Sequence, residues 1–235
     1  MNIVTGASQN HVKSLNQFIE SVYPYQEHIQ NLIIYNLGIN DSDWESIKIM
    51  TKSKNIENTI FKAFDYNRYP KWYDINVNAG EYAWKSAIIM ETYSLFPNTI
   101  LFWMDSGNKI TGDLLPLIND VKINGLYSGP TGGDIKKWTH ANTLEILQPV
   151  NITLMNRNGA CIGFDLSKSW VQNFITEFAE YCSNKDCIAP KGSSRKNHRQ
   201  DQAILTILYY KYQDIWNFKM SNFKFKCYTI HNDID

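Results

Sequence analysis

An unbroken apolar segment that ends in a cluster of polar residues is the most constraining feature of this sequence. The stretch from 99 to 108 reads TILFWMDSGN, so a run of apolar side chains stops abruptly at Asp105. Such a run followed by turn-forming residues predicts a fully buried central strand. Ligands of open α/β sheets bind beyond the carboxyl ends of the strands, which places Asp105 where chemistry is usually done. Asp, Ser, Gly and Asn also favour a simple turn, so the segment alone leaves both interpretations open.

Length and charge limit the fold and the kind of partner. The chain has 235 residues, with 23 basic and 23 acidic side chains. This length suits one large α/β domain or two small ones. A nucleic-acid-binding protein needs a basic field to neutralise phosphates, and the densest basic cluster here, residues 191–199, is short and loop-like. We therefore expect no nucleic-acid partner.

The cysteines and the opening residues bear on the compartment. Cys182 and Cys187 are too far apart for a CxxC metal or redox pair, so reduced thiols are expected. The chain enters a predicted strand at once, without the basic and apolar regions of a signal peptide. No window approaches the apolar length of a membrane span. The expectation is a soluble protein, either cytoplasmic or excised from something larger.

Apolar periodicity predicts alternating strands and helices. In the first half, strands are expected at 2–7, 31–37, 59–64 and 99–104, and helices at 11–23, 41–47 and 80–96. In the second half, helices are expected at 111–118, 137–147, 168–181 and 199–212, strands at 125–128, 158–164 and 224–230, and loops at 129–133 and 187–197. This order predicts a single α/β domain over 1–235, with a mostly parallel central sheet and helices on both faces.

The chain opens IVTGAS, and Tyr181 and Lys185 are separated by three residues. These two motifs resemble those of a short-chain dehydrogenase, which would bind NAD(P). A dinucleotide loop needs further glycines so that the backbone approaches the pyrophosphate, but Asn10 and Val12 occupy those places. Lys185 also lies where the preceding helix is expected to end. The dehydrogenase is therefore a distant alternative.

Seven short segments, in order along most of the chain, carry a second resemblance: IVTGAS at 3–8, EYAWKS at 81–86, LFWMDSGN at 101–108, WTH at 138–140, NGACIGF at 158–164, DCIAPKG at 186–192 and HRQDQ at 198–202. Through these segments the sequence resembles nucleotide-sugar glycosyltransferases of the GT-A fold, and most nearly a poorly characterised glycosyltransferase-like family of animals, protists and large viruses.

The resemblance implies a nucleotide-binding half over about 1–110 and an acceptor- and sugar-binding half over about 111–235. It assigns the nucleotide to the turn after the first strand and to the end of the central strand, through Thr5, Gly6, Ala7, Asp105, Ser106 and Gly107. Lys85 would reach the diphosphate as a point charge. The alternative for Lys85 is a solvated helix lysine, but its aromatic neighbours Tyr82 and Trp84 indicate a mostly buried surface.

Asp105 matches the first position of the Asp-x-Asp element of this fold. There a carboxylate holds a divalent cation, usually Mn²⁺, that neutralises the leaving nucleoside diphosphate. Gly107 stands where the second Asp is expected, and Asn108 follows with only a neutral oxygen. Either Asp105 and a late histidine, His231, hold the metal more weakly, or the enzyme works without one.

The resemblance places Asp201 opposite the sugar and the acceptor. An inverting transferase needs a base for the acceptor hydroxyl, whereas a retaining one would use this carboxylate to hold sugar hydroxyls. The alternative is an Asp that stabilises the first turn of a helix. Close to the sugar or acceptor we also expect Gly159, Ala160, His140 and Gln202, although Gly159 is equally suited to a tight turn and His140 to a packed core position.

The sequence thus predicts a glycosyltransferase, of hexosyl type, that moves a sugar from a nucleotide donor, in the first place a UDP-sugar, to a hydroxyl of a glycan or protein. The missing second Asp keeps one alternative open, a catalytically inactive relative that only binds a glycan or nucleotide sugar. These two hypotheses differ in whether Asp105 and Asp201 converge on one cleft.

Overall fold

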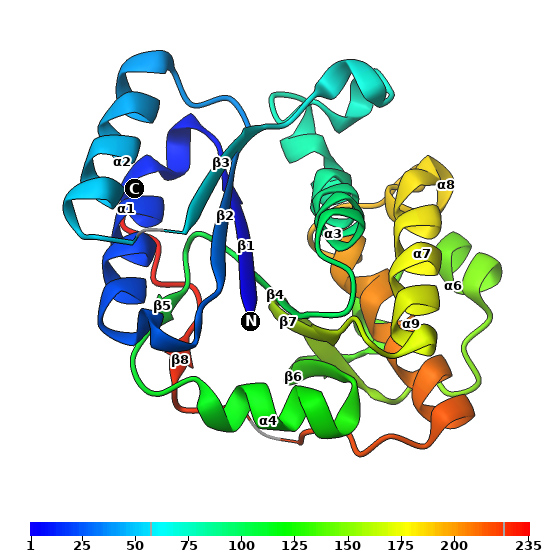
Figure 1. The fold of residues 1–235 in the computed structure, drawn as a ribbon. Coiled ribbons are helices and arrows are strands. Elements are labelled where there is room, and N and C mark those ends of the chain that lie inside the picture. Colours follow the sequence, from blue (N-terminus) through cyan, green and yellow to red (C-terminus); the bar gives the residue numbers. More distant parts are fainter. Residues whose placement is uncertain (57, 223) are drawn as a thin grey trace.

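A six-stranded mixed sheet forms the centre of the computed structural model, which describes residues 1–56, 58–222 and 224–235 (Figure 1). In spatial order its strands are β3 (Thr59–Ala63), β2 (Asn31–Asn36), β1 (Asn2–Ala7), β4 (Ile100–Met104), β7 (Met155–Asp165) and β6 (Leu126–Asp134). The first four strands are parallel, and β7 is antiparallel to both of its neighbours. The predicted mostly parallel sheet is confirmed.

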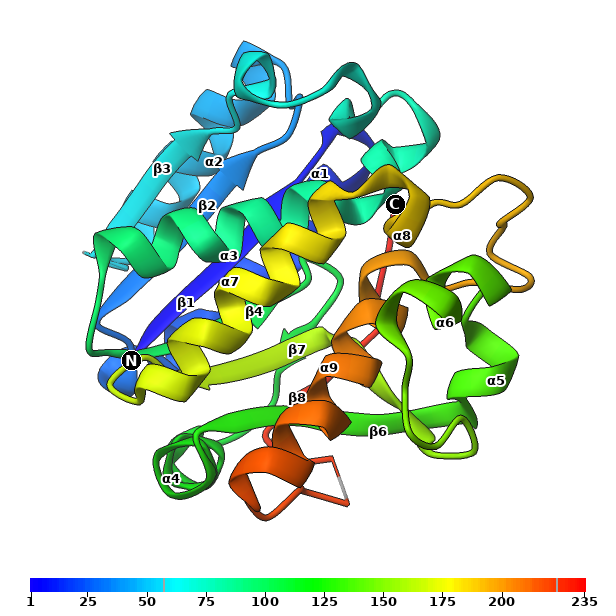
Figure 2. The same cartoon turned by 90° about the vertical axis from the view of Figure 1, so that its right-hand side faces the viewer.

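Helices cover both faces of this sheet (Figure 2). One layer, packed on β1, β2 and β4 through one apolar cluster, contains α3 (Ala83–Leu95), α7 (Ser169–Ser183), α8 (Lys185–Ile188) and α9 (Gln200–Trp216). The opposite layer contains α1 (Val12–Val22), α2 (Asp41–Ser53) and α4 (Leu115–Asn124). Two short helices, α5 (Ile135–Trp138) and α6 (Ala141–Leu147), lie beside α9. No helix in the described ranges is long and apolar enough to cross a membrane.

The strand β4 is the buried central strand that its apolar run predicts. Successive side chains of a strand point to opposite faces. Leu101 and Trp103 accordingly pack under α3 and α7, whereas Phe102 and Met104 pack under α1 and α4. All four side chains are fully buried. A strand covered on both faces needs no polar alternation, which explains the continuous apolar sequence.

The second half departs from the sequence-based expectations in several elements. The predicted loop at 129–133 belongs to β6, where Pro130 is tolerated because β6 is an edge strand. The predicted helix at 111–118 starts only at Leu115, with Pro116 in its first turn, and continues to Asn124. The predicted helix at 137–147 is split between α5 and α6, because Thr139 and His140 adopt extended backbone conformations.

The first half follows the prediction more closely. The helix α2 is capped by Asn40, whose side chain accepts a hydrogen bond from the Asp43 amide, and it is longer than expected.

The last predicted strand is reduced to β8 (Tyr228–Thr229), which pairs with β5 (Lys109–Ile110) in a separate small sheet. This pairing brings the segment after β8 back to the end of β4. All four cysteines are buried and free, as expected.

Candidate functional site

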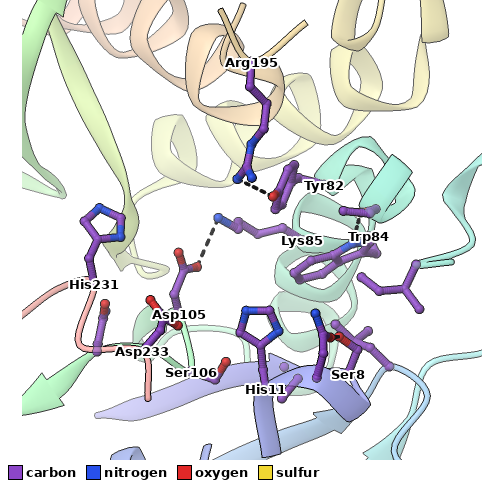
Figure 3. Close-up of a pocket in the computed structure, with 18 residues that line it drawn as sticks. Ser8, His11, Tyr82, Trp84, Lys85, Asp105, Ser106, Arg195, His231 and Asp233 are labelled. Carbon is purple, nitrogen blue, oxygen red and sulfur yellow. Dashed lines mark hydrogen bonds and ion pairs between the residues drawn. The ribbon is translucent and has the colours of Figure 1, made fainter. Parts of the chain in front are cut away.

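A pocket of about 260 Å³ lies at the carboxyl ends of β1 and β4 (Figure 3). The two strands are parallel neighbours, so the residues that follow them emerge at the same edge of the sheet. Gly6 and Ala7 line the pocket from β1, and the turn Asp105–Asn108 lines it from β4. Five of the predicted nucleotide-binding positions therefore lie around this pocket together with Asp105: Gly6, Ala7, Lys85, Ser106 and Gly107.

Lys85 joins the two predicted catalytic carboxylates. Its ammonium lies 3.1 Å from Asp105 Oδ1 and 3.1 Å from Asp201 Oδ2, and it donates a 3.1 Å hydrogen bond to the carbonyl of Gly159. Burial by itself lowers the pKa of Lys85, but the two carboxylates outweigh it and hold the pKa above its ordinary value. Lys85 is therefore a charged, nearly buried ammonium held between Asp105 and Asp201.

Asp105 is oriented by the strand that precedes it and by β7. The indole N–H of Trp103 donates a 2.6 Å hydrogen bond to Asp105 Oδ1, the oxygen that also faces Lys85. The Asp105 amide donates to the carbonyl of Ala160, 2.9 Å away. Among the described residues, no hydrogen bond or ion pair engages Oδ2 of Asp105. One carboxylate oxygen thus remains available on a rigidly held side chain.

Asp201 lies in the first turn of α9 and reaches the pocket through Lys85. Its side chain is 6 % exposed and does not line the pocket directly. Burial raises the pKa of Asp201, while Lys85 opposes this shift. A Cβ atom added at Gly159 would lie 3.5 Å from Asp201 Oδ2, an ordinary van der Waals distance, so the Asp201 carboxylate lies next to the β7 backbone.

Hydrogen bonds fix α9 against β7. The Thr206 hydroxyl donates a 2.7 Å hydrogen bond to the side chain of Asn156 and accepts a 3.0 Å hydrogen bond from the amide of Arg157. The predicted sugar-side residue Gln202 accepts a 3.3 Å hydrogen bond from the Gly159 amide. The two elements thereby set the spacing between Asp201 and the Gly159–Ala160 backbone.

A strained turn forms another wall of the pocket. Asn78, Ala79, Gly80, Glu81 and Tyr82 all have positive φ angles, between 48° and 60°. The left-handed conformation costs about 1–2 kcal/mol per non-glycine residue. This turn delays the start of α3 to Ala83, three residues after the predicted start, and brings Ala79 and Tyr82 into the pocket. Strain of this kind is typical of functional sites.

Arg195 also lines the pocket, and sequence reasoning missed it. Its guanidinium donates a 2.5 Å hydrogen bond to the Tyr82 hydroxyl and lies 5.3 Å from the centre of that ring. Among the described residues that line the pocket, Lys85 and Arg195 are the two that carry a permanent positive charge. Arg195 belongs to the basic cluster 191–199, whose composition was the available signal.

The segment after β8 contributes two further side chains, His231 and Asp233. The Asn232 amide donates a 2.8 Å hydrogen bond to the carbonyl of Gly107, and the Gln17 side chain donates a 2.7 Å hydrogen bond to the carbonyl of Asn232. His231 thus lies at the same pocket as Asp105. Among the described residues, no group of three or more His, Cys, Asp or Glu side chains is arranged to hold a metal ion.

Thr5 and His140 do not line the pocket. Thr5 is fully buried within β1, so its side chain faces the interior. His140 caps α6 by accepting a hydrogen bond from the Asn142 amide, and its own amide donates 3.3 Å to His198 Nδ1. His140 is half-buried and hydrogen-bonded at the start of α6, outside the apolar core.

The dehydrogenase resemblance has no structural support. Tyr181 belongs to α7 and Lys185 to α8, so the two side chains do not share one helix. The strand β7 is also antiparallel to β4, whereas the mostly parallel sheet of a dinucleotide-binding fold continues past its fourth strand.

Comparison with known proteins identifies the fold of this chain. The family described as "Protein of unknown function (DUF1647)" matches residues 1–90, which is less than half of the chain. No protein with curated annotation matches the sequence. Solved structures of glycosyltransferases are similar over most of its length. The chain has the GT-A fold.

Three of these structures illustrate the similarity. The galactosyltransferase LgtC, in complex with donor and acceptor sugar analogues, is 16 % identical, with 89 % of this chain and 70 % of LgtC covered at a TM-score of 0.58. Mouse xyloside xylosyltransferase 1 is 9 % identical, with 95 % and 84 % covered at a TM-score of 0.58. Core-mannan synthase A from Aspergillus fumigatus, in its Mn/GDP form, is 9 % identical, with 88 % and 68 % covered at a TM-score of 0.56. At these identities the similarity establishes the fold.

Proposed function

We propose that this protein is a glycosyltransferase that moves a sugar from a nucleoside-diphosphate donor to a hydroxyl of a glycan or protein. The observation that carries the proposal is the convergence of Asp105 and Asp201 on the ammonium of Lys85, at the end of the central strand. An inactive binding relative has no need of a nearly buried second carboxylate, which is costly to desolvate.

The proposed donor site is the pocket at the ends of β1 and β4. Gly6 and Ala7 would receive the base and ribose through backbone groups, with Thr5 supporting them from within β1. Ser106 and Gly107 would lie near the diphosphate. In this proposal residues 1–110 form the nucleotide-binding half and 111–235 the acceptor half, which supplies Gly159, Ala160 and Gln202. His140, outside the pocket, is retained only as a more distant acceptor contact.

Charge balance at the pocket bears on how the diphosphate is held. Lys85 already faces two carboxylates, so its positive charge is more than offset. Arg195 carries no carboxylate partner among the described residues and presents a guanidinium that is suited to phosphate oxygens. We therefore assign the direct contact with the diphosphate to Arg195 and a structural and electrostatic role to Lys85.

A divalent cation, Mn²⁺ in the first place, fits this pocket chemically. The Mn/GDP form of core-mannan synthase A is a precedent in the same fold. When bound, the cation would neutralise the leaving diphosphate. Asp105 offers a carboxylate oxygen free of other described partners, and His231 lines the same pocket. Asp105 and His231 are the ligands proposed from the sequence.

In the transfer step, the bond between the sugar C1 and the diphosphate oxygen breaks and a bond to the acceptor oxygen forms. The acceptor proton passes to a base, and the nucleoside diphosphate leaves. Asp201 is the proposed sugar-side carboxylate, as a base in an inverting reaction or as a ligand of sugar hydroxyls in a retaining one. Its raised pKa is in the direction that a proton acceptor needs.

A ligand screen tests the proposal directly. UDP-, GDP- and CMP-sugars, each with and without Mn²⁺, should be compared by thermal shift, followed by assays of donor hydrolysis and of transfer to glycans. Stabilisation by a UDP-sugar together with sugar release supports a transferase. Stabilisation without any turnover would indicate the inactive binding relative. A hexosyl donor and a cytoplasmic location stay predictions from the sequence.

A further inference from the structure

The place of the missing second Asp is occupied by a carboxylate from elsewhere in the chain. A Cβ atom added to Gly107 would collide with Oδ1 of Asp233 and would lie 2.6 Å from its Cγ and 2.7 Å from Oδ2. The φ angle of Gly107 is outside the positive range, so the backbone itself accepts an ordinary residue there. Gly107 therefore leaves space for the Asp233 carboxylate, rather than serving a turn that only glycine can make.

The segment that carries Asp233 is held in place on both sides of it. On one side, the Asn232 amide bonds to the Gly107 carbonyl. On the other, the Ile234 amide donates 3.0 Å to the Ser14 hydroxyl. Asp235 accepts a 2.8 Å hydrogen bond from the Lys13 amide and a further bond from the Ser14 hydroxyl, at the start of α1. The position of Asp233 at residue 107 thus follows from hydrogen bonds made by its neighbours.

The carboxylate of Asp233 has no competing partner. Within the described part of the chain it makes no hydrogen bond or ion pair, and it lines the pocket together with Asp105 (Figure 3). Asp233 is exposed to solvent, so both of its carboxylate oxygens are accessible to a ligand that enters the pocket. The carboxylates of Asp105 and Asp233 repel each other, and a cation bound between the end of β4 and the segment after β8 would relieve this repulsion.

We propose that Asp233 supplies the second carboxylate of a divalent-cation site whose first carboxylate is Asp105. This inference rests on the proposed function, in which the cation also binds the donor diphosphate. Mg²⁺ and similar hard cations bind through one or two carboxylates plus substrate phosphates, so a third protein ligand is not required. Residues distant in sequence replace an element that is normally contiguous, and the pocket gains its second carboxylate only when the segment after β8 docks.

Moving the carboxylate between the two positions tests this inference. Free Mn²⁺ is counted by electron paramagnetic resonance during titration of the wild type, Asp233→Asn and the exchanged variant Gly107→Asp/Asp233→Gly, with and without UDP. Asp233→Asn should weaken Mn²⁺ binding by at least about 10-fold, in the range seen when metal-site partners are lost. The exchanged variant should recover most of it. Asp214→Asn, an exposed Asp outside the pocket, is the matched control.

The outcomes separate this inference from the proposed function. If Asp233→Asn binds Mn²⁺ with the same affinity as the wild type, the role of Asp233 is overturned. The role is also overturned if the wild type binds no Mn²⁺. UDP binding in excess chelator, measured by calorimetry, reports on the nucleotide site without any metal, so the donor site is judged independently. An unchanged metal-free melting temperature in Asp233→Asn excludes loss of the docked segment as the cause.

Discussion

Lys85 places its ammonium 3.1 Å from a carboxylate oxygen of Asp201, and each of the two side chains is only 6 % exposed. Removal of one partner from a buried ion pair leaves an uncompensated charge, which costs far more than the pair contributes. This relationship ties the stability of the protein to the same residues that the proposed chemistry uses.

Lys85→Met should destabilise the fold by about 3–5 kcal/mol, because Asp201 then stays buried without its cation. Urea denaturation at neutral pH measures the change. The double variant Lys85→Met/Asp201→Leu should regain much of the loss, since both buried charges of this pair are then removed. Lys48→Met, at an exposed ion pair with Glu45, is the control and should cost about 1 kcal/mol or less. If Lys85→Met lowers the free energy of unfolding as little as Lys48→Met does, the proposed stabilising role of the buried Lys85–Asp201 pair is wrong.

Asp201→Asn should lower turnover by orders of magnitude while donor affinity changes little. A group that acts mainly in the transition state affects kcat more than ground-state binding. Steady-state kinetics and a binding titration separate these quantities, and the anomeric configuration of the product, read by NMR, assigns the role. Inversion supports a base, and retention supports a ligand of sugar hydroxyls. Transfer at the wild-type rate would exclude Asp201 from catalysis.

Arg195→Ala should weaken UDP by about 10-fold and leave uridine nearly unaffected, because a charge-assisted hydrogen bond to phosphate contributes about 1.5–3 kcal/mol. Isothermal titration calorimetry with the two ligands gives the comparison. The neighbouring Lys196→Ala is the matched control, since Lys196 does not line the pocket. Equal losses for UDP and uridine would mean that Arg195 maintains the pocket wall through Tyr82 and does not bind the diphosphate.

The burial of His198 leads us to expect that the protein loses stability in mild acid. Its Nε2 lies 2.9 Å from the Ile188 carbonyl and its Nδ1 accepts from the His140 amide, so the neutral ring uses both nitrogens. Burial lowers the pKa of His198 from 6.5 to about 4. The unfolded chain takes up the proton first as the pH falls, so stability is complete above pH 6.5 and declines toward pH 4, by about 3 kcal/mol at most.

Urea denaturation at several pH values tests this behaviour. His198→Gln keeps a donor and an acceptor but does not titrate, so its stability should depend less steeply on pH over this range. Identical slopes for the wild type and His198→Gln would contradict the assignment.

Much of the first half could be predicted because its signals are local. The segment 2–7 is a short apolar run and 11–23 shows helical apolar periodicity, and the structure has a strand at Asn2–Ala7 and a helix at Val12–Val22. The second half was harder. The strand β6 contains Gly and Pro residues that favour loops, and it is a strand only because β7 pairs with it. Local propensity carries no information about that partner.

The candidate site shows the same division. Asp105 was singled out from its sequence surroundings, and Lys85 and Asp201 from the family resemblance; the three side chains lie together in the structure. Arg195 and Asp233 were not identified, because a single Arg in a basic loop or a single Asp in a polar segment has no distinguishing pattern. The roles proposed for them depend on Tyr82 and Gly107, which are more than a hundred positions away in the chain.

The sequence by itself determined the alternation of strands and helices, the buried central strand and the placement of Asp105 at its carboxyl end, because apolar periodicity and turn residues act over a few neighbouring positions. Only the tertiary structure decided that Lys85 stands between two carboxylates and that Asp233 fills the space over Gly107. Those contacts join distant segments, and burial and electrostatic energies depend on what surrounds a side chain in space.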